Sequence, residues 1–209
     1  MVLLAEIESD LNQMNFILGN CRFLTYDSYN LRVPDTNEKF ITIHHDKFLA
    51  RLPETFWKLA IIELTKLYSS NIKNDHFSII LFVKFLRRNH FTSSWKEMIT
   101  SEELEELDTS FKTHELKMRI GRLLELRKQH YAHKDKNPDH HIFDVKFYLP
   151  DCVVLIEIAE NVLRILASKF GFQMKISDYN GNQVNDFIEK YIELRKIAAM
   201  QSLIKRPNS

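Results

Sequence analysis

Residues 150–171 read PDCVVLIEIAENVLRILASKFG. Proline suits the first turn of an α-helix, where its missing N–H costs no hydrogen bond, and glycine suits the position just after the last turn. Between the two, apolar residues recur at three- and four-residue steps, the spacing of one helix face: Val153, Ile156, Val162, Leu163, Leu166 and Phe170. The stretch therefore predicts a strong helix that opens at Pro150 and is capped by Gly171.

The rest of the chain has few residues that favour turns. Its 209 residues include 4 glycines and 5 prolines, too few to separate the many short strands of a sandwich or barrel. No two glycines stand at the spacing of a dinucleotide-binding fingerprint or a P-loop. We predict an all-α fold, a single-domain bundle of about six or seven helices over residues 1–209 that ends in a helix over about residues 183–203.

Further apolar stripes locate the other helices. One lies at the start of the chain, on Leu4, Ile7, Leu11, Met14 and Leu18. Residues 26–37 are predicted to be a connector, and residues 40–43 a short extended piece. Thr100 and Glu103 have the spacing of a capping box and open a helix that reaches toward His133, with a break expected near Asp108 or Gly121.

Charge and cysteine content restrict the function classes. The formal net charge is +1, so no global field favours nucleic acid or anionic lipid, and any such binding must be local. The chain has 2 cysteines and no Cys-x-x-Cys pair, which fits a reducing cytosol. The apolar runs are far shorter than the roughly 20 residues of a membrane span. We predict a cytoplasmic protein with no membrane partner.

Polar and charged side chains are most concentrated at residues 126–136, which read LRKQHYAHKDK. Arg127 and His133 are of two residue types that together suffice for RNA cleavage without a metal ion. Histidine moves protons near neutral pH, and arginine holds the phosphate as negative charge develops on it. Six residues on a straight helix place the two side chains about 120° apart, so a symmetric dimer is the simplest way to bring both to one phosphate.

The spacing from Arg127 to His133 resembles the Arg-x(4 to 6)-His motif of the HEPN superfamily, and LRKQHYAHKD resembles the subgroup of abortive-infection U proteins of phage defence. The resemblance covers about residues 1–170 and implies a HEPN-like core, usually dimeric. It further implies a metal-independent endoribonuclease of a phage-defence or toxin-antitoxin system, with Arg127 and His133 as catalytic residues in a composite dimer site. RNA is the implied substrate, and an antitoxin or a nucleotidyltransferase is the implied partner.

One position departs from the superfamily pattern. The residue after the arginine is often Asn, Asp or His there, and it is Lys128 here. A lysine can hold phosphate as a point charge but cannot accept a hydrogen bond, so an orienting role at this position is in doubt. The RNA-contact candidates around the motif are Arg122, Lys128, His130, Tyr131 and Lys134.

The same residues allow two other interpretations. His130, His133 and Asp135 suggest a metal cluster, but there is no nearby cysteine and no His-Glu-x-x-His string, so we predict no metal and no cofactor. The second interpretation is a non-catalytic HEPN-type helical module that binds a partner protein or RNA, since some superfamily members are inactive scaffolds.

Overall fold

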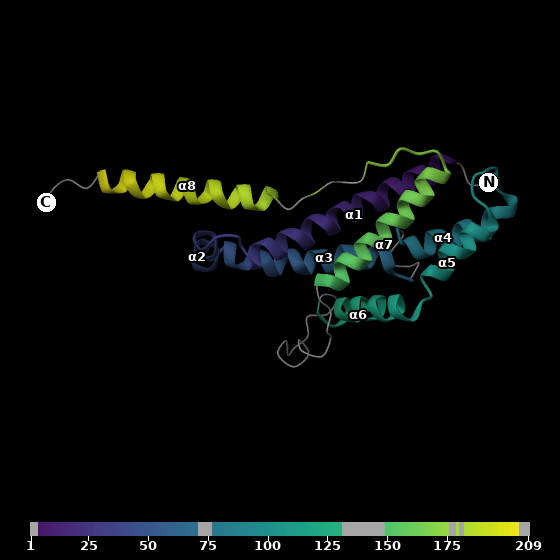
Figure 1. The fold of residues 1–209 in the computed structure, drawn as a ribbon, viewed down its shortest axis with the longest axis horizontal. Helices are drawn as coiled ribbons and strands as arrows, with labels where there is room; N and C mark the ends of the chain where they lie inside the picture. Colours follow the sequence, from purple (N-terminus) through teal and green to yellow (C-terminus); the bar gives the residue numbers. More distant parts are fainter. Residues whose placement is uncertain (1–3, 71–76, 131–148, 176–178, 180–181, 205–209) are drawn as a thin grey trace. The chain divides into compact units, whose positions relative to one another are not determined.

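The structure is a computed structural model that describes residues 4–70, 77–130, 149–175, 179 and 182–204 (Figure 1). These residues contain no strand, which confirms the predicted all-α class. Their elements are α1 (Leu4–Arg32), α2 (Asn37–His45), α3 (Leu52–Tyr68), α4 (Ile79–Asn89), α5 (Ser101–Ser110), α6 (His114–His130), α7 (Leu149–Lys169) and α8 (Asn182–Ile204), with short 3₁₀ turns at Leu49–Arg51 and His90–Thr92. Of these helices, none is long and apolar enough to cross a membrane.

The chain divides into two compact units. Unit 1 consists of Met1–Arg22 and Lys58–Ser177, and unit 2 consists of Phe23–Trp57 and Asp178–Ser209. The division falls inside α1 and inside α3, so each of these helices contributes one segment to each unit. Each unit has a core of its own and is described separately below.

Unit 1 is built around α7. The first part of α1 runs antiparallel to it, because Arg22 pairs with Glu160 while the earlier Asn15 donates to the carbonyl of the later Lys175 at 2.9 Å. The predicted α1 stripe is buried at Ile7, Leu11, Met14 and Leu18. At the end of α3, the buried Tyr68 hydroxyl donates to the Leu155 carbonyl at 2.5 Å.

Both predicted helix caps in unit 1 are confirmed. Gly171 has a φ of 73°, a left-handed conformation that favours glycine. The N–H of Phe172 donates to the Ala167 carbonyl at 2.8 Å, and that of Gly171 to Ser168 at 3.2 Å, the pair of bonds that closes a helix in this way. Thr100 and Glu103 form a complete capping box at the start of α5.

The break in the long predicted helix follows Ser110. The residues between α5 and α6 are 111–113, three positions beyond the expected break at Asp108. The alternative break at Gly121 is wrong, since Gly121 lies within α6 and a Cβ added there would meet nothing within 4 Å. The first helix is also longer than expected, and residues 26–32 of the predicted connector belong to α1.

Glu160 on α7 gives the stability of unit 1 a pH dependence. Burial opposes its ionisation, but hydrogen bonds from Arg164 and Arg22 outweigh burial and hold the pKa of Glu160 below its usual range. A carboxyl with a lowered folded-state pKa stabilises the fold above its unfolded pKa, and this stabilisation is lost as the pH falls through the folded pKa.

Glu160→Gln is therefore expected to lower the free energy of unfolding by about 1 kcal/mol near neutral pH. The difference from the parent should shrink as the pH falls below 4.5, the ordinary value for Glu. Urea unfolding of both chains across this pH range measures it. Glu157→Gln, at an exposed position on the same helix, is the control, and a difference that stays constant with pH would contradict the assignment.

Unit 2 is held together by the first half of α8. The buried apolar side chains that form its core are Leu31, Ile43, Leu49, Val184, Ile188 and Ile192. Lys39 of α2 is 3% exposed and pairs with Asp35 at 3.0 Å and with Glu189 of α8 at 2.7 Å. The Tyr191 hydroxyl donates to Asp46 at 2.5 Å.

The predicted extended piece at residues 40–43 is wrong, because these residues are helical in α2. Thr36 caps this helix by accepting a hydrogen bond from the N–H of Lys39 at 3.3 Å. Ile43 then points into the unit 2 core, where it is 2% exposed. The helix therefore gains its stability from residues of α8 that are distant in the sequence.

Candidate functional site

α6 carries the described part of the predicted motif. Its packed side is marked by buried apolar residues at three- and four-residue steps: Leu116, Ile120, Leu123 and Leu126. Arg127 follows Leu123 by four positions and Ile120 by seven, so it lies on this same side of the helix. The Arg127 side chain is accordingly half-buried. It stands three residues before the end of α6 at His130.

The described RNA-contact candidates do not share the Arg127 face. Arg122 and Lys128 are both exposed. At 3.6 residues per turn they lie about 140° and about 100° around the helix from Arg127. The position of His130 is closer, about 60° from that of Arg127. α6 therefore does not present Arg122, Arg127 and Lys128 as one cationic surface.

Tyr131, His133 and Lys134 lie outside the described residues. The meeting of Arg127 and His133 at one phosphate therefore stays a prediction. Among the residues that the structure describes, no group of three or more His, Cys, Asp or Glu side chains is placed to hold a metal ion.

An arginine that the sequence did not single out joins α6 to α7. Arg119 pairs with Asp151 in the first turn of α7 and with Glu115 on its own helix at 2.9 Å. Hydrogen bonding to Glu115, together with the charge of Asp151, outweighs burial and raises the pKa of Arg119 above its usual value. This ion pair fixes the two helices against each other at a point two turns before Arg127.

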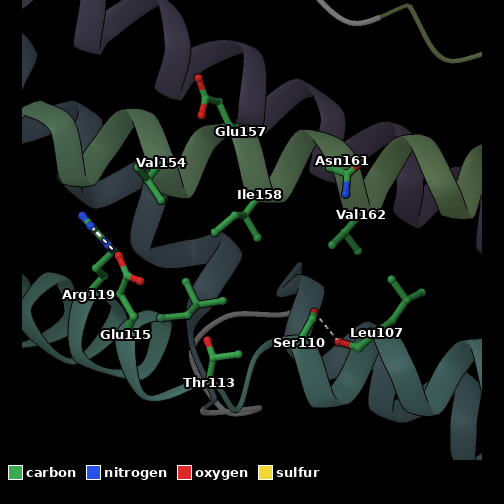
Figure 2. A pocket seen from close by; sticks show the side chains of 11 residues that line it. Leu107, Ser110, Thr113, Glu115, Arg119, Val154, Glu157, Ile158, Asn161 and Val162 are labelled. Atoms are coloured by element: carbon green, nitrogen blue, oxygen red, sulfur yellow. Dashed lines mark hydrogen bonds and ion pairs between the residues drawn. The ribbon is translucent and has the colours of Figure 1, made fainter.

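Next to this ion pair, a groove of about 450 Å³ opens between α7 and the α5–α6 segment (Figure 2). Its apolar lining consists of Leu107, Leu116, Val154, Ile158 and Val162, and its polar lining of Ser110, Thr113, Glu115, Arg119, Glu157 and Asn161. In Figure 2 the side chains of Val154, Ile158 and Val162 point from α7 toward α5 and α6, while Glu157 points away.

The groove favours binding over catalysis. Its walls are mainly aliphatic, and Arg119 already holds two carboxylates there. Among the lining residues that the structure describes, there is no histidine or cysteine to move a proton or attack a substrate. The arrangement can bury apolar side chains of a ligand and bond polar ones at the rim, which is how many helical grooves recognise a partner.

A sequence signal for this groove was present and was missed. Val154 and Ile158 stand four residues apart on α7 and are absent from the predicted stripe, whereas Val162, four residues further on, belongs to that stripe and also lines the groove. A helix with apolar residues on more than one side has two faces to cover.

Comparisons with protein-family models, with curated proteins and with solved structures give no match for the chain.

Proposed function

We propose that the chain is a metal-independent endoribonuclease of a phage-defence or toxin-antitoxin system, active in the cytoplasm as a homodimer. The ribose 2′-hydroxyl attacks the adjacent phosphorus, the bond to the 5′-oxygen breaks, and a cyclic phosphate remains on the upstream fragment. His133 carries the protons that the 2′-oxygen loses and the 5′-oxygen gains. Arg127 stabilises the charge on the phosphate oxygens.

The observation that supports this proposal most is the position of Arg127. A guanidinium that grips a reacting phosphate must be held in place and partly shielded from water, because electrostatic stabilisation is stronger at lower dielectric. Arg127 is half-buried on the packed side of α6, unlike the exposed Arg122 and Lys128. The motif histidine follows six positions later in the sequence.

The test is an RNA cleavage assay with the purified chain in the presence of excess EDTA. The expected result is cleavage that the chelator does not change, with 2′,3′-cyclic phosphate on one fragment and a 5′-hydroxyl on the other. Cleavage that needs an added metal ion, or fragments with 3′-hydroxyl ends, would contradict the proposal. An antitoxin or a nucleotidyltransferase that binds the chain would lower the rate.

The groove between α7 and the α5–α6 segment favours a second candidate, a non-catalytic HEPN-type helical module that binds a partner protein. A toxin or defence protein of this kind is expected to arrest growth when it is expressed in cells. Under this second hypothesis the arrest depends on the groove, so Ile158→Glu, which places a charge on the apolar wall, abolishes it. His133→Ala leaves the arrest intact. The ribonuclease proposal predicts the opposite pattern for the two variants, and circular dichroism of both variants shows whether each one folds.

A further inference from the structure

The second half of α8 is exposed on every side. Each residue from Glu193 to Gln201 is exposed, whereas Val184, Ile188 and Ile192 in the first half are buried in the unit 2 core. Several large apolar side chains on α8 nevertheless face solvent: Phe187 at 49%, Leu194 at 65%, Ile197 at 51% and Met200 at 62%. An isolated helical segment of this length is marginal in water without a packed face, so this surface needs a partner.

Three of these apolar residues form a stripe of their own. Phe187, Leu194 and Ile197 are separated by seven and then three positions, which is the repeat of helices that pair along a seam. The stripe lies about 130° around the helix from the side that Val184, Ile188 and Ile192 bury in unit 2. The unit 2 core therefore leaves the α8 stripe uncovered.

We propose that the α8 stripe is an interface with a second copy of this chain, and that the two α8 helices pair antiparallel. The stripe is self-complementary about a point between Arg195 and Lys196. An antiparallel partner centred there sets Leu194 beside Ile197 of the second copy, and Lys190 beside Gln201. Such a contact uses the same surface on both copies, which are related by a two-fold axis, so it joins two copies and no more.

The charges of the segment favour the antiparallel direction. Residues 182–193 contain three acids, Asp186, Glu189 and Glu193, and a single base. Residues 194–204 contain two bases, Arg195 and Lys196, and no acid. Antiparallel pairing lays each acidic half along the basic half of the other chain, whereas parallel pairing sets like charges together.

The two bases nearest the symmetry axis have partners within unit 2. Lys196 pairs with Glu38 at 2.6 Å, and the guanidinium carbon of Arg195 lies 5.9 Å from the centre of the Tyr191 ring. These contacts lie outside the α8 stripe and partly neutralise the charges of both residues. The α8 interface is a separate contact from the composite site that the ribonuclease proposal forms from Arg127 and His133. The two fail separately, because Leu194→Glu with Ile197→Glu tests the α8 contact by molecular mass, whereas the ends of the RNA fragments test the site.

Sedimentation equilibrium of the full chain tests the interface. The parent is expected to have at least twice the 24.9 kDa mass of one chain, and Leu194→Glu with Ile197→Glu is expected to halve the measured mass. Phe91→Glu, at another exposed apolar position, 78% exposed, is the matched control and should keep the parent mass. Circular dichroism checks that all three chains are folded.

Three results would overturn the proposal. The first is a monomeric parent at all concentrations tested, and the second is a double variant that keeps the parent mass. The third is a monomeric parent that cosediments with phosphatidylglycerol vesicles through Leu194 and Ile197, which would make a lipid surface the occupant of the stripe.

Disulfide trapping tests the direction of pairing. The native Cys21 and Cys152 are both fully buried, and burial raises the pKa of each thiol, so they do not compete. Leu194→Cys with Ile197→Cys should give a covalent dimer on oxidation. Phe187→Cys should give none, because antiparallel pairing sets the two copies of position 187 about 25 Å apart along the axis. A covalent Phe187→Cys dimer would overturn the antiparallel arrangement.

Discussion

RNA cleavage by the purified chain is expected to fall by about 100- to 10,000-fold in His133→Ala, the range by which a positioned proton carrier accelerates such reactions. Without the imidazole, water must take the proton from the 2′-hydroxyl and supply one to the leaving oxygen. Arg127→Ala is expected to cost about 100- to 1,000-fold, because the phosphate then develops charge without its guanidinium. Initial rates on one defined RNA measure both effects.

The control for this experiment lies on the same helix. Lys117 is exposed and lies ten positions, about 15 Å along α6, before Arg127, so Lys117→Ala removes a positive charge without touching the proposed site and should change the rate less than about 10-fold. The double variant of Arg127 and His133 should be little slower than the slower single variant, since groups that act on one step are not additive. Equal rates for the parent and both single variants would remove the ribonuclease proposal.

The largest loss of stability is expected for Trp95→Ala. Trp95 is 0% exposed in unit 1, with its ring centroid 5.7 Å from that of Phe170 and 6.1 Å from that of His90. Removing a buried indole forfeits its transfer free energy and leaves a cavity that the neighbours cannot fill. The expected cost is about 3–5 kcal/mol in the free energy of unfolding, measured by urea titration.

Trp95→Phe separates packing from hydrogen bonding at this site. The indole Nε1 has no hydrogen-bond acceptor among the described residues, so phenylalanine keeps much of the ring contact without breaking a bond to the protein. We expect a loss of less than about half of that caused by alanine. An equal loss in the two variants would mean that the indole N–H, and not the ring, carries the stabilisation.

The helical class was predictable because it depends on composition and local spacing. The scarcity of glycine and proline excludes most β folds, and the apolar stripe of α1 depends only on the spacing of nearby residues. The caps at Thr100 and Gly171 are local in the same way, and both are present in the structure. The wrong predictions concern segments whose structure depends on contacts with residues that are distant in the sequence. Residues 26–32 resemble a connector, but Ser28 donates to the Pro53 carbonyl at 2.7 Å and Asp27 accepts from Tyr179, so tertiary partners satisfy the polar groups that suggested a loop.

The candidate site was predictable in part for the same reason. The side of α6 on which Arg127 lies follows from its spacing to Leu123 and Ile120. The groove did not follow, because its walls come from α5, α6 and α7 and depend on how these helices pack. Lys39 was missed as well, since a lysine becomes buried only when acidic partners such as Glu189 arrive from another part of the chain.

Unit 2 is built from two stretches that are far apart in the sequence, so its core cannot be completed until the second stretch has been synthesised. Asp46 and Tyr191 are bonded across 145 positions, and Val184, Ile188 and Ile192 complete the core that Leu31 and Ile43 begin. On a ribosome, the earlier stretch is made long before its C-terminal counterpart, so its apolar residues stay uncovered until α8 emerges. Contacts of such long range form slowly, so the time needed to translate the residues between the two stretches of unit 2 sets how long this surface is open to chaperones.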